Sequence, residues 1–169
     1  MNNTRLLLDR LSRLMQAGAW ARGLNPAQAA ALDYLARANR FSRAPSHVAD
    51  YLGTTRGTTS QTLQALARKG LVQADAAFAD RRSVSYRITE KGKAADQAGG
   101  LPGAVDAAEQ AVLDRVLERM VRGLAAEGRT FGLCATCRYH QPGPRCALLN
   151  LALAAEEADQ LCHEHQPAA

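Results

Sequence analysis

The sequence predicts a mainly α-helical chain with one small β-wing and a small C-terminal metal-binding appendage. Three observations predict it. Apolar residues recur at helical spacing through most of the chain, one short stretch alternates as a strand does, and all four cysteines lie in the last quarter. With 47% apolar and 22% charged residues among 169, the chain can form one compact domain and an appendage.

The N-terminal half contains clear helix signals. Apolar spacing predicts a first helix over Leu6–Trp20, and Asn25 followed by Pro26 is the pattern of an N-cap and a first helical residue. Ser46 is expected to cap a short helix over 47–52 that ends at Gly53. A further helix is predicted from about Thr55 to Lys69, with Gly70 as its terminator.

Two short helices joined by a tight glycine turn are typical of a helix-turn-helix. Leu63, Leu66 and Ala67 can face inward on the second helix, while short polar and guanidinium groups occupy its leading and outer surface. Such groups can approach phosphates and base edges in a major groove, although hydroxyl groups at a helix start can also serve only as caps. The candidate DNA-binding residues are Thr55, Arg56, Thr58, Thr59, Ser60, Gln61 and Gln64.

A two-stranded ribbon is expected to follow directly, with strands over 71–74 and 83–88 and with Thr89 capping the next helix. A helix-turn-helix followed by such a ribbon is a winged helix. Arg81 and Arg82 lie beside Asp80 between the strands, and a guanidinium at a hairpin tip suits the narrow, negative minor groove. The net charge of +5 also favours an anionic partner.

The stretch from Leu52 to Val72, followed by the wing Asp80-Arg81-Arg82-Ser83 and then Ile88-Thr89-Glu90-Lys91-Gly92, resembles the MarR family of bacterial winged-helix transcriptional regulators. The wing is the most specific part, and the similarity covers about residues 5 to 127. The resemblance implies a recognition helix from Thr55 to Lys69, Arg82 as the minor-groove residue and Asp80 as the carboxylate that orients the wing arginines. It also implies a homodimer that binds pseudo-palindromic double-stranded DNA.

The helix predicted over Val105–Leu124 has an apolar stripe wider than one small domain needs, which favours packing against a partner chain. Residues 99–103 contain three glycines and a proline, so a hinge is expected where the family continues a helix. The predicted organisation is therefore an N-terminal dimerisation helix over 1–24, a DNA-binding domain over 25–98, a hinge and dimerisation helix over 99–128, and a cysteine-rich extension over 129–169.

Cys134, Cys137, Cys146 and Cys162 are the candidate metal ligands, and His165 is a possible alternative ligand. The Cys-x-x-Cys pair can reach one metal from a single turn, while Pro142-Gly143-Pro144 provides a turn that brings Cys146 near. Cys162 is expected at the end of a helix that starts near Ala154. One pair plus two isolated cysteines is compatible with a four-cysteine zinc site or a 4Fe-4S iron-sulfur cluster, and disulfide switching without a metal is a third alternative.

No signal peptide or membrane segment is evident in the sequence, so we expect a cytoplasmic protein in which the thiols are reduced. No motif places a catalytic site, and we expect no enzyme activity. Two functions remain open. One is a dimeric DNA-binding regulator whose DNA affinity responds to metal loss or redox change at the cysteines, or in which the metal is only a structural staple. The other is a redox or metal-handling protein that uses the winged helix for protein interaction.

Overall fold

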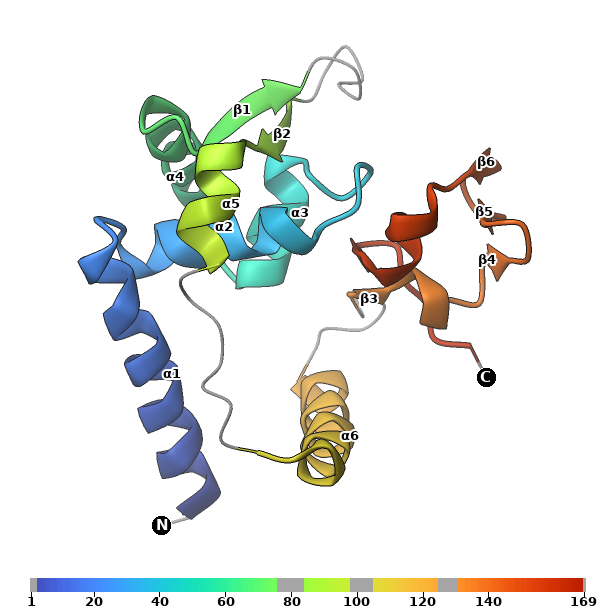
Figure 1. Ribbon diagram of the computed structural model, residues 1–169, viewed down its shortest axis with the longest axis horizontal. Coiled ribbons are helices and arrows are strands. Elements are labelled where there is room, and N and C mark those ends of the chain that lie inside the picture. The colour runs from blue at the N-terminus through green and yellow to red at the C-terminus, as the bar shows by residue number, and fades with distance from the viewer. Residues whose placement is uncertain (1–2, 76–83, 98–104, 125–130, 169) are drawn as a thin grey trace. The chain divides into compact units, whose positions relative to one another are not determined.

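The computed structural model describes residues 3–75, 84–97, 105–124 and 131–168. These residues form two compact units, Met1–Leu101 and Pro102–Ala169, shown in Figure 1. The boundary predicted at 98/99 falls among residues 98–104, which lie outside the described residues. No helix in the described ranges has a stretch long and apolar enough to cross a membrane.

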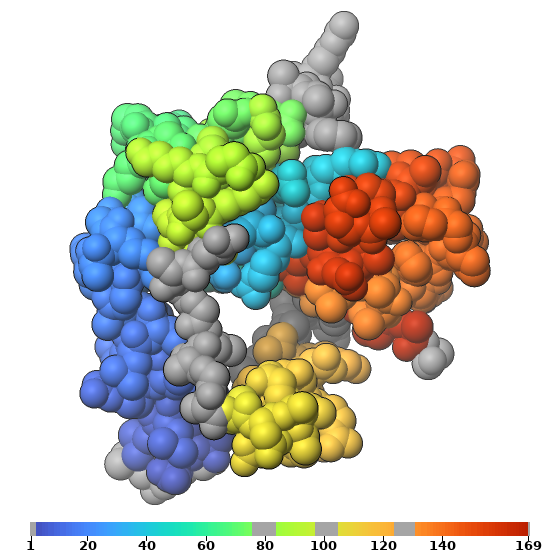
Figure 2. Space-filling view, in the orientation of Figure 1, coloured from blue at the N-terminus to red at the C-terminus, as the bar shows by residue number. Residues whose placement is uncertain are grey.

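The first unit begins with α1 (Asn3–Ala21) and α2 (Pro26–Arg37). Asn25 caps α2 as predicted: its Oδ1 accepts a hydrogen bond from Gln28 N at 2.8 Å, and Gln28 Oε1 accepts one from Asn25 N at 3.3 Å. Helix α1 extends away from the body formed by the other helices of its unit, as the space-filling view also shows (Figures 1 and 2). Of its described side chains, only Ala19 is buried.

The helix-turn-helix consists of α3 (Pro45–Leu52) and α4 (Arg56–Arg68). Gly53 takes the left-handed conformation at φ 61° and ends α3, as predicted. The predicted Ser46 cap is wrong. The N-cap is Ala44, and Pro45 takes the first helical position because its fixed φ suits that place and its missing N–H leaves no donor unsatisfied.

Strands β1 (Val72–Asp75) and β2 (Ser85–Ile88) pair antiparallel, with Val72 opposite Ile88 and Asp75 opposite Ser85. They are followed by α5 (Glu90–Gln97), which Thr89 caps by accepting a hydrogen bond from Gly92 N at 3.1 Å. The predicted two-stranded ribbon is therefore confirmed for residues 72–75 and 85–88. Each strand begins one or two residues later than predicted.

The core of this unit joins α2, α3 and α4 to the start of the ribbon. Its largest buried side chains are Leu24, Leu32, Tyr34, Leu35, Val48, Leu63, Leu66 and Val72. Tyr34 donates a 2.6 Å hydrogen bond from its hydroxyl to the Ser42 carbonyl, so this buried polar atom is satisfied. The mainly helical fold with a small wing is thus confirmed, and this core fixes the outer face of α4.

In the second unit, Asp106 caps the start of α6 (Ala107–Leu124): its Oδ1 accepts hydrogen bonds from Ala108 N and Glu109 N. Residues 131–168 then form a separate arrangement of very short elements. Strands β3 (Gly132–Leu133) and β7 (Leu161–Cys162) pair antiparallel. Strands β4 (His140–Gln141), β5 (Arg145–Cys146) and β6 (Leu151–Ala152) make a second small sheet.

The helix predicted from about Ala154 is wrong. The chain there forms only a five-residue 3-10 turn, η2 (Ala155–Asp159), and Cys162 lies in a strand. Glu157 is buried and its carboxylate accepts a 2.8 Å hydrogen bond from Ala154 N, which caps the turn. Pairing of β7 with β3 then requires extended backbone, so the helix cannot continue to Cys162.

Candidate DNA-binding surface and cysteine site

The outer face of α4 carries most of the predicted DNA-contacting side chains. The side chains of Thr55, Arg56, Thr58, Gln61 and Gln64 are exposed, and that of Ser60 is half-buried. On the opposite face, Leu63 and Leu66 are fully buried. A rigid core therefore holds a row of hydroxyl, amide and guanidinium groups toward solvent.

Thr59 does not belong to this row. Its side chain is only 1% exposed, and its hydroxyl oxygen has no hydrogen-bond partner within the described residues. Thr59 and Leu63 are four residues apart, so they fall on the same inward face of the helix. The prediction that Thr59 contacts DNA is therefore corrected: Thr59 is a core residue.

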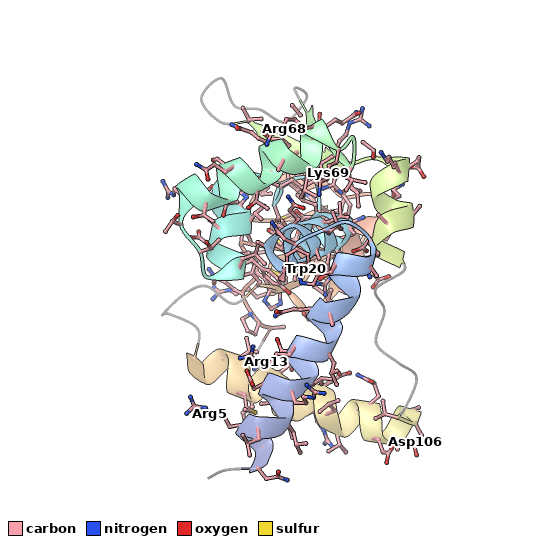
Figure 3. The ribbon with its side chains drawn as sticks, turned by 90° about the vertical axis from the view of Figure 1, so that its left-hand side faces the viewer. Arg5, Arg13, Trp20, Arg68, Lys69 and Asp106 are labelled. Atoms are coloured by element: carbon pink, nitrogen blue, oxygen red, sulfur yellow. The ribbon has the colours of Figure 1, made fainter. Side chains whose placement is uncertain are left out.

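Several hydrogen bonds fix the ends of α4. At its start, Thr55 Oγ1 accepts from Thr58 N at 3.2 Å and lies 2.9 Å from Thr58 Oγ1. At its end, Lys69 Nζ donates to Gly23 O at 2.6 Å and to Gln28 Oε1 at 2.8 Å. Figure 3 shows Arg68 and Lys69 at this end of the helix. These bonds tie the candidate recognition helix to the cap of α2 and limit its movement.

The wing is anchored to the same region. Thr89 Oγ1 donates to Gly70 O at 2.8 Å, Lys91 Nζ donates to Lys69 O at 2.9 Å, and Tyr86 N donates to Arg43 O at 3.1 Å. The three residues predicted at the wing tip, Asp80, Arg81 and Arg82, lie outside the described residues.

Two helices expose apolar side chains on a single chain. On α1 these are Leu6, Leu7, Leu11, Leu14, Met15 and Trp20; for residues 105–124 they are Val105, Val112, Leu113, Val116, Met120 and Val121. Trp20 is 65% exposed, and Figure 3 shows it on the surface of α1 with Arg5 and Arg13. Rows of exposed large apolar side chains favour burial against a partner.

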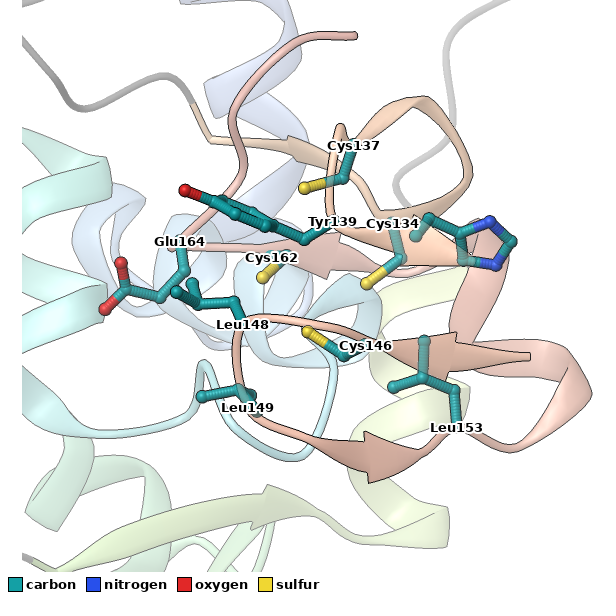
Figure 4. A pocket seen from close by; sticks show the side chains of 10 residues that line it. Cys134, Cys137, Tyr139, Cys146, Leu148, Leu149, Leu153, Cys162 and Glu164 are labelled. Carbon is teal, nitrogen blue, oxygen red and sulfur yellow. The ribbon is translucent and has the colours of Figure 1, made fainter. Parts of the chain in front are cut away.

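The four cysteines come together around one hollow of about 300 Å³, counting space that opens to solvent. Figure 4 shows their Sγ atoms turned toward the space between the cysteine-bearing segments. Cys134, Cys137 and Cys162 are buried and Cys146 is half-buried. All four are thiols; no disulfide joins any pair of them in this part of the chain.

Backbone pairing places each cysteine. Cys134 starts the 3-10 turn η1 (Cys134–Thr136), and Cys137 N donates to Cys134 O at 3.0 Å, which closes the Cys-x-x-Cys turn. Cys146 pairs with His140 between β5 and β4, and Cys162 pairs with Gly132 between β7 and β3. A bridge between Cys137 and Pro167 holds the C-terminal segment against the same turn.

The three histidines of the cysteine-rich extension have different surroundings. His165 is buried but does not line the hollow: its Nε2 lies 3.0 Å from Thr136 Oγ1, and its ring lies against Gly132. His163 Nε2 lies 3.1 Å from Glu164 Oε1. His140 does line the hollow, and its Nε2 is buried without a partner among the residues described.

The sequence did not single out the apolar walls of the hollow, which are Tyr139, Leu148, Leu149 and Leu153. Leu148 and Leu149 lie in a turn and Leu153 directly follows strand β6 (Leu151–Ala152), and all three line the hollow beside the cysteines. Among the residues described, no three Cys, His, Asp or Glu side chains are placed to hold a single metal ion. The site is thus a hollow lined by four thiols.

Comparison with known proteins supports a winged-helix fold for the first unit. Residues 22–83 match the model of the MarR family, and no curated protein matches the chain by sequence. The transcriptional regulator PA3341 is 28% identical with a TM-score of 0.56, over 72% of this chain and 97% of that one. A MarR transcriptional regulator from Methanosarcina mazei is 22% identical with a TM-score of 0.56, over 73% and 91% of the two chains.

The S. aureus MepR in its DNA complex is 18% identical with a TM-score of 0.55, over 72% of this chain and 93% of that protein. At this level of identity the likeness shows the fold alone. The cysteine unit, residues 131–168, lies outside the family match. The first unit therefore resembles the MarR-family model over residues 22–83 and shares its winged-helix fold with solved structures of MarR-family regulators.

Proposed function

We propose that this protein is a DNA-binding transcriptional regulator that acts as a homodimer. The observation that carries the proposal is the exposed polar row of α4, held by a buried opposite face inside a winged helix. Arg56, Gln61 and Gln64 project where a recognition helix enters the major groove. The fold shared with MepR, whose structure was solved with DNA, supports this use of the helix.

The wing supplies the second contact in this proposal. Strands β1 and β2 pair antiparallel, and the sequence between them includes Arg81 and Arg82. Either guanidinium can enter a narrow minor groove, with Asp80 orienting them, and the net charge of +5 favours approach to DNA. Action on DNA places the protein in the cytoplasm.

The second copy in the dimer would cover the apolar faces of α1 and α6. Both helices expose large aliphatic side chains along several turns, and a soluble monomer rarely leaves so many uncovered. A two-fold dimer would also present two copies of α4, which matches a pseudo-palindromic operator with half-sites about one helical turn apart, ~34 Å.

The cysteine unit would act as the regulatory input. It follows α6 along the chain after only residues 125–130, so folding or unfolding of this unit can affect the dimer helix. A small unit of short strands with four converging thiols depends on a bound metal centre, zinc or iron-sulfur, for stability. Loss of the centre would then change DNA affinity.

A gel-shift assay with DNA from upstream of the protein's own gene tests the proposal. We expect saturable binding that competitor DNA of unrelated sequence does not remove, and weaker binding by Arg82→Ala. Absence of binding at low salt by both metal-loaded and metal-free protein would contradict the proposal. It would favour a metal-handling protein that uses the winged helix for protein contacts.

A further inference from the structure

Lys69, the C-cap of α4, bonds the end of the candidate recognition helix to the corner between α1 and α2. Its Nζ donates a 2.6 Å hydrogen bond to the Gly23 carbonyl oxygen and a 2.8 Å hydrogen bond to Gln28 Oε1. These acceptors lie 46 and 41 residues away along the chain. One ammonium group therefore connects elements that the sequence separates widely.

The corner that receives these bonds is rigidly built. Gly23 takes the left-handed conformation at φ 70°, and its N–H donates to the Trp20 carbonyl oxygen at 3.0 Å. Leu24 N donates to the Ala19 carbonyl oxygen at 3.0 Å, which completes a Schellman ending of α1. Gln28 is only 9% exposed and closes the capping box of α2. The ammonium group therefore holds a carbonyl and a buried side chain that move together with the end of α1.

The same end of α4 is also bonded to α5. Lys91 Nζ donates to the Lys69 carbonyl oxygen at 2.9 Å, and Thr89 Oγ1 donates to the Gly70 carbonyl oxygen at 2.8 Å. Along the chain, residues 98–106 separate α5 from α6, and they include three glycines and a proline, which disfavour a continuous helix. Helix α1 is itself a dimer helix in the proposed function. The bonds of the Lys69 side chain are thus the more direct connection from the dimer interface to α4.

We infer that Lys69 is a positioning residue that fixes α4 relative to α1 and thereby sets the half-site spacing that the dimer accepts. Helix α1 projects from the other helices of its unit and exposes the apolar side chains that the second copy would cover (Figure 1). Its direction therefore determines where each α4 is held in the dimer. Two rigidly held recognition helices accept one spacing, whereas a loosened link lets them adjust to others. The inference rests on the proposed function, because it requires a dimer on two half-sites.

The test uses two operator fragments, one with the native spacing and one with a single base pair inserted at its centre. The insertion moves one half-site by about 3.4 Å along the duplex and rotates it by about 35°. Wild-type protein should bind the altered operator at least about tenfold more weakly than the native one. Lys69→Met keeps the length of the side chain but removes the ammonium group. It should bind the native operator about fivefold more weakly, with less than about threefold further loss on the altered one.

The salt dependence of binding separates positioning from a direct phosphate contact. Lys69→Met should keep the wild-type slope of log affinity against log salt on the native operator, whereas loss of a phosphate contact would reduce the slope by about 1. Arg68→Met is the charge-matched control, since Arg68 is an exposed cation on the same turn of the helix (Figure 3). It should keep the wild-type spacing preference. A reduced slope with an unchanged spacing preference in Lys69→Met would overturn the inference.

Gln28→Leu tests the same link from the other side and without a change of charge. It removes one of the two acceptors and leaves the Gly23 carbonyl, so it should relax the spacing preference in the same direction as Lys69→Met but to a smaller extent. In urea unfolding at one protein concentration, the midpoint shift of the double variant should be smaller than the sum of the two single shifts, because both remove one shared hydrogen bond. Additive shifts would contradict the link.

The outcomes separate this inference from the proposed function. Wild-type protein that binds the native operator specifically, together with a Lys69→Met variant that keeps the full spacing preference, refutes the positioning role and leaves the regulator intact. Wild-type protein without specific DNA binding refutes the regulator and the positioning role together.

Discussion

The ring of His165 lies directly against the Cα of Gly132, so that a Cβ at residue 132 would stand 2.6 Å from His165 Nδ1. Gly132 pairs with Cys162, and His165 Nε2 lies 3.0 Å from Thr136 Oγ1 inside the Cys-x-x-Cys turn. This contact therefore joins the strand that carries one cysteine to the turn that carries two others.

Gly132→Ala should destabilise the cysteine unit by about 1–3 kcal/mol, because the added methyl group must displace a buried ring. Bound metal per protomer should fall, and the unfolding temperature of the cysteine unit should decrease. Gly123→Ala in α6 is the control, since its Cβ meets nothing within 4 Å; it should be neutral or slightly stabilising. Equal metal content in both variants would show that the Gly132 contact is not needed.

Gly92→Ala should destabilise the first unit. A Cβ at Gly92 would lie 2.1 Å from the Leu71 carbonyl oxygen, and that carbonyl is backbone in the turn between α4 and the wing. We expect a loss of at least about 1–3 kcal/mol in urea unfolding. Gly57→Ala, where a Cβ meets nothing within 4 Å, should show no such loss.

Thr59→Val should stabilise the winged helix by about 1 kcal/mol, because it removes a buried hydroxyl that lacks a partner among the described residues while keeping the side-chain shape. DNA affinity should not change. Ser60→Val, at the half-buried neighbouring position, is the comparison variant for both stability and DNA affinity. A large loss of DNA affinity in Thr59→Val would reverse the assignment of Thr59 to the core.

Arg82→Ala should weaken DNA binding and reduce the slope of log affinity against log salt by about 1, as expected for loss of one cationic contact in the minor groove. Gln61→Ala should instead change sequence preference, by about 1–3 kcal/mol at one base pair, with little change in the slope. Fluorescence anisotropy over a salt series distinguishes the two. Identical behaviour of both variants would contradict their different roles.

Asp96 gives a pH-dependent prediction. Burial raises the pKa of Asp96, the Asp33 carboxylate raises it further, and Arg37 and Arg22 act in the opposite direction. The ionised form is thus disfavoured in the folded state, so Asp96→Asn should stabilise the first unit at neutral pH. The gain should shrink as pH falls through the raised pKa toward about 3.9, the value in the unfolded chain, because folded wild-type protein then takes up the proton.

Local signals in the sequence were sufficient for most of the first unit. Asn25-Pro26, Gly53 and Thr89 act through their own backbone and nearest neighbours, and the structure confirms each of them. Ser46 was misassigned because Pro45 competes for the helix start. Thr59 was misassigned because its hydroxyl group was taken as a sign of exposure, although its four-residue spacing from Leu63 places it on the inward face.

The cysteine unit was less predictable. Its apolar residues between Leu148 and Leu161 have helical spacing, yet pairing of β7 with β3 and capping by Glu157 give a short turn between strands instead. The pairing of β7 with β3 joins segments some thirty residues apart, which periodicity cannot reveal. The four cysteines nevertheless line one hollow. They were selected by residue type, so the error in secondary structure did not affect their selection.

The most direct test of the regulator account is an anaerobic titration of operator DNA, found upstream of the protein's own gene, with metal-loaded and metal-free protein. The account predicts specific binding by one form and an affinity at least about tenfold weaker for the other, which corresponds to about 1.4 kcal/mol of coupling. Specific binding of equal affinity in both forms would contradict the regulatory role of the cysteine unit, and no specific binding by either form would contradict the regulator itself.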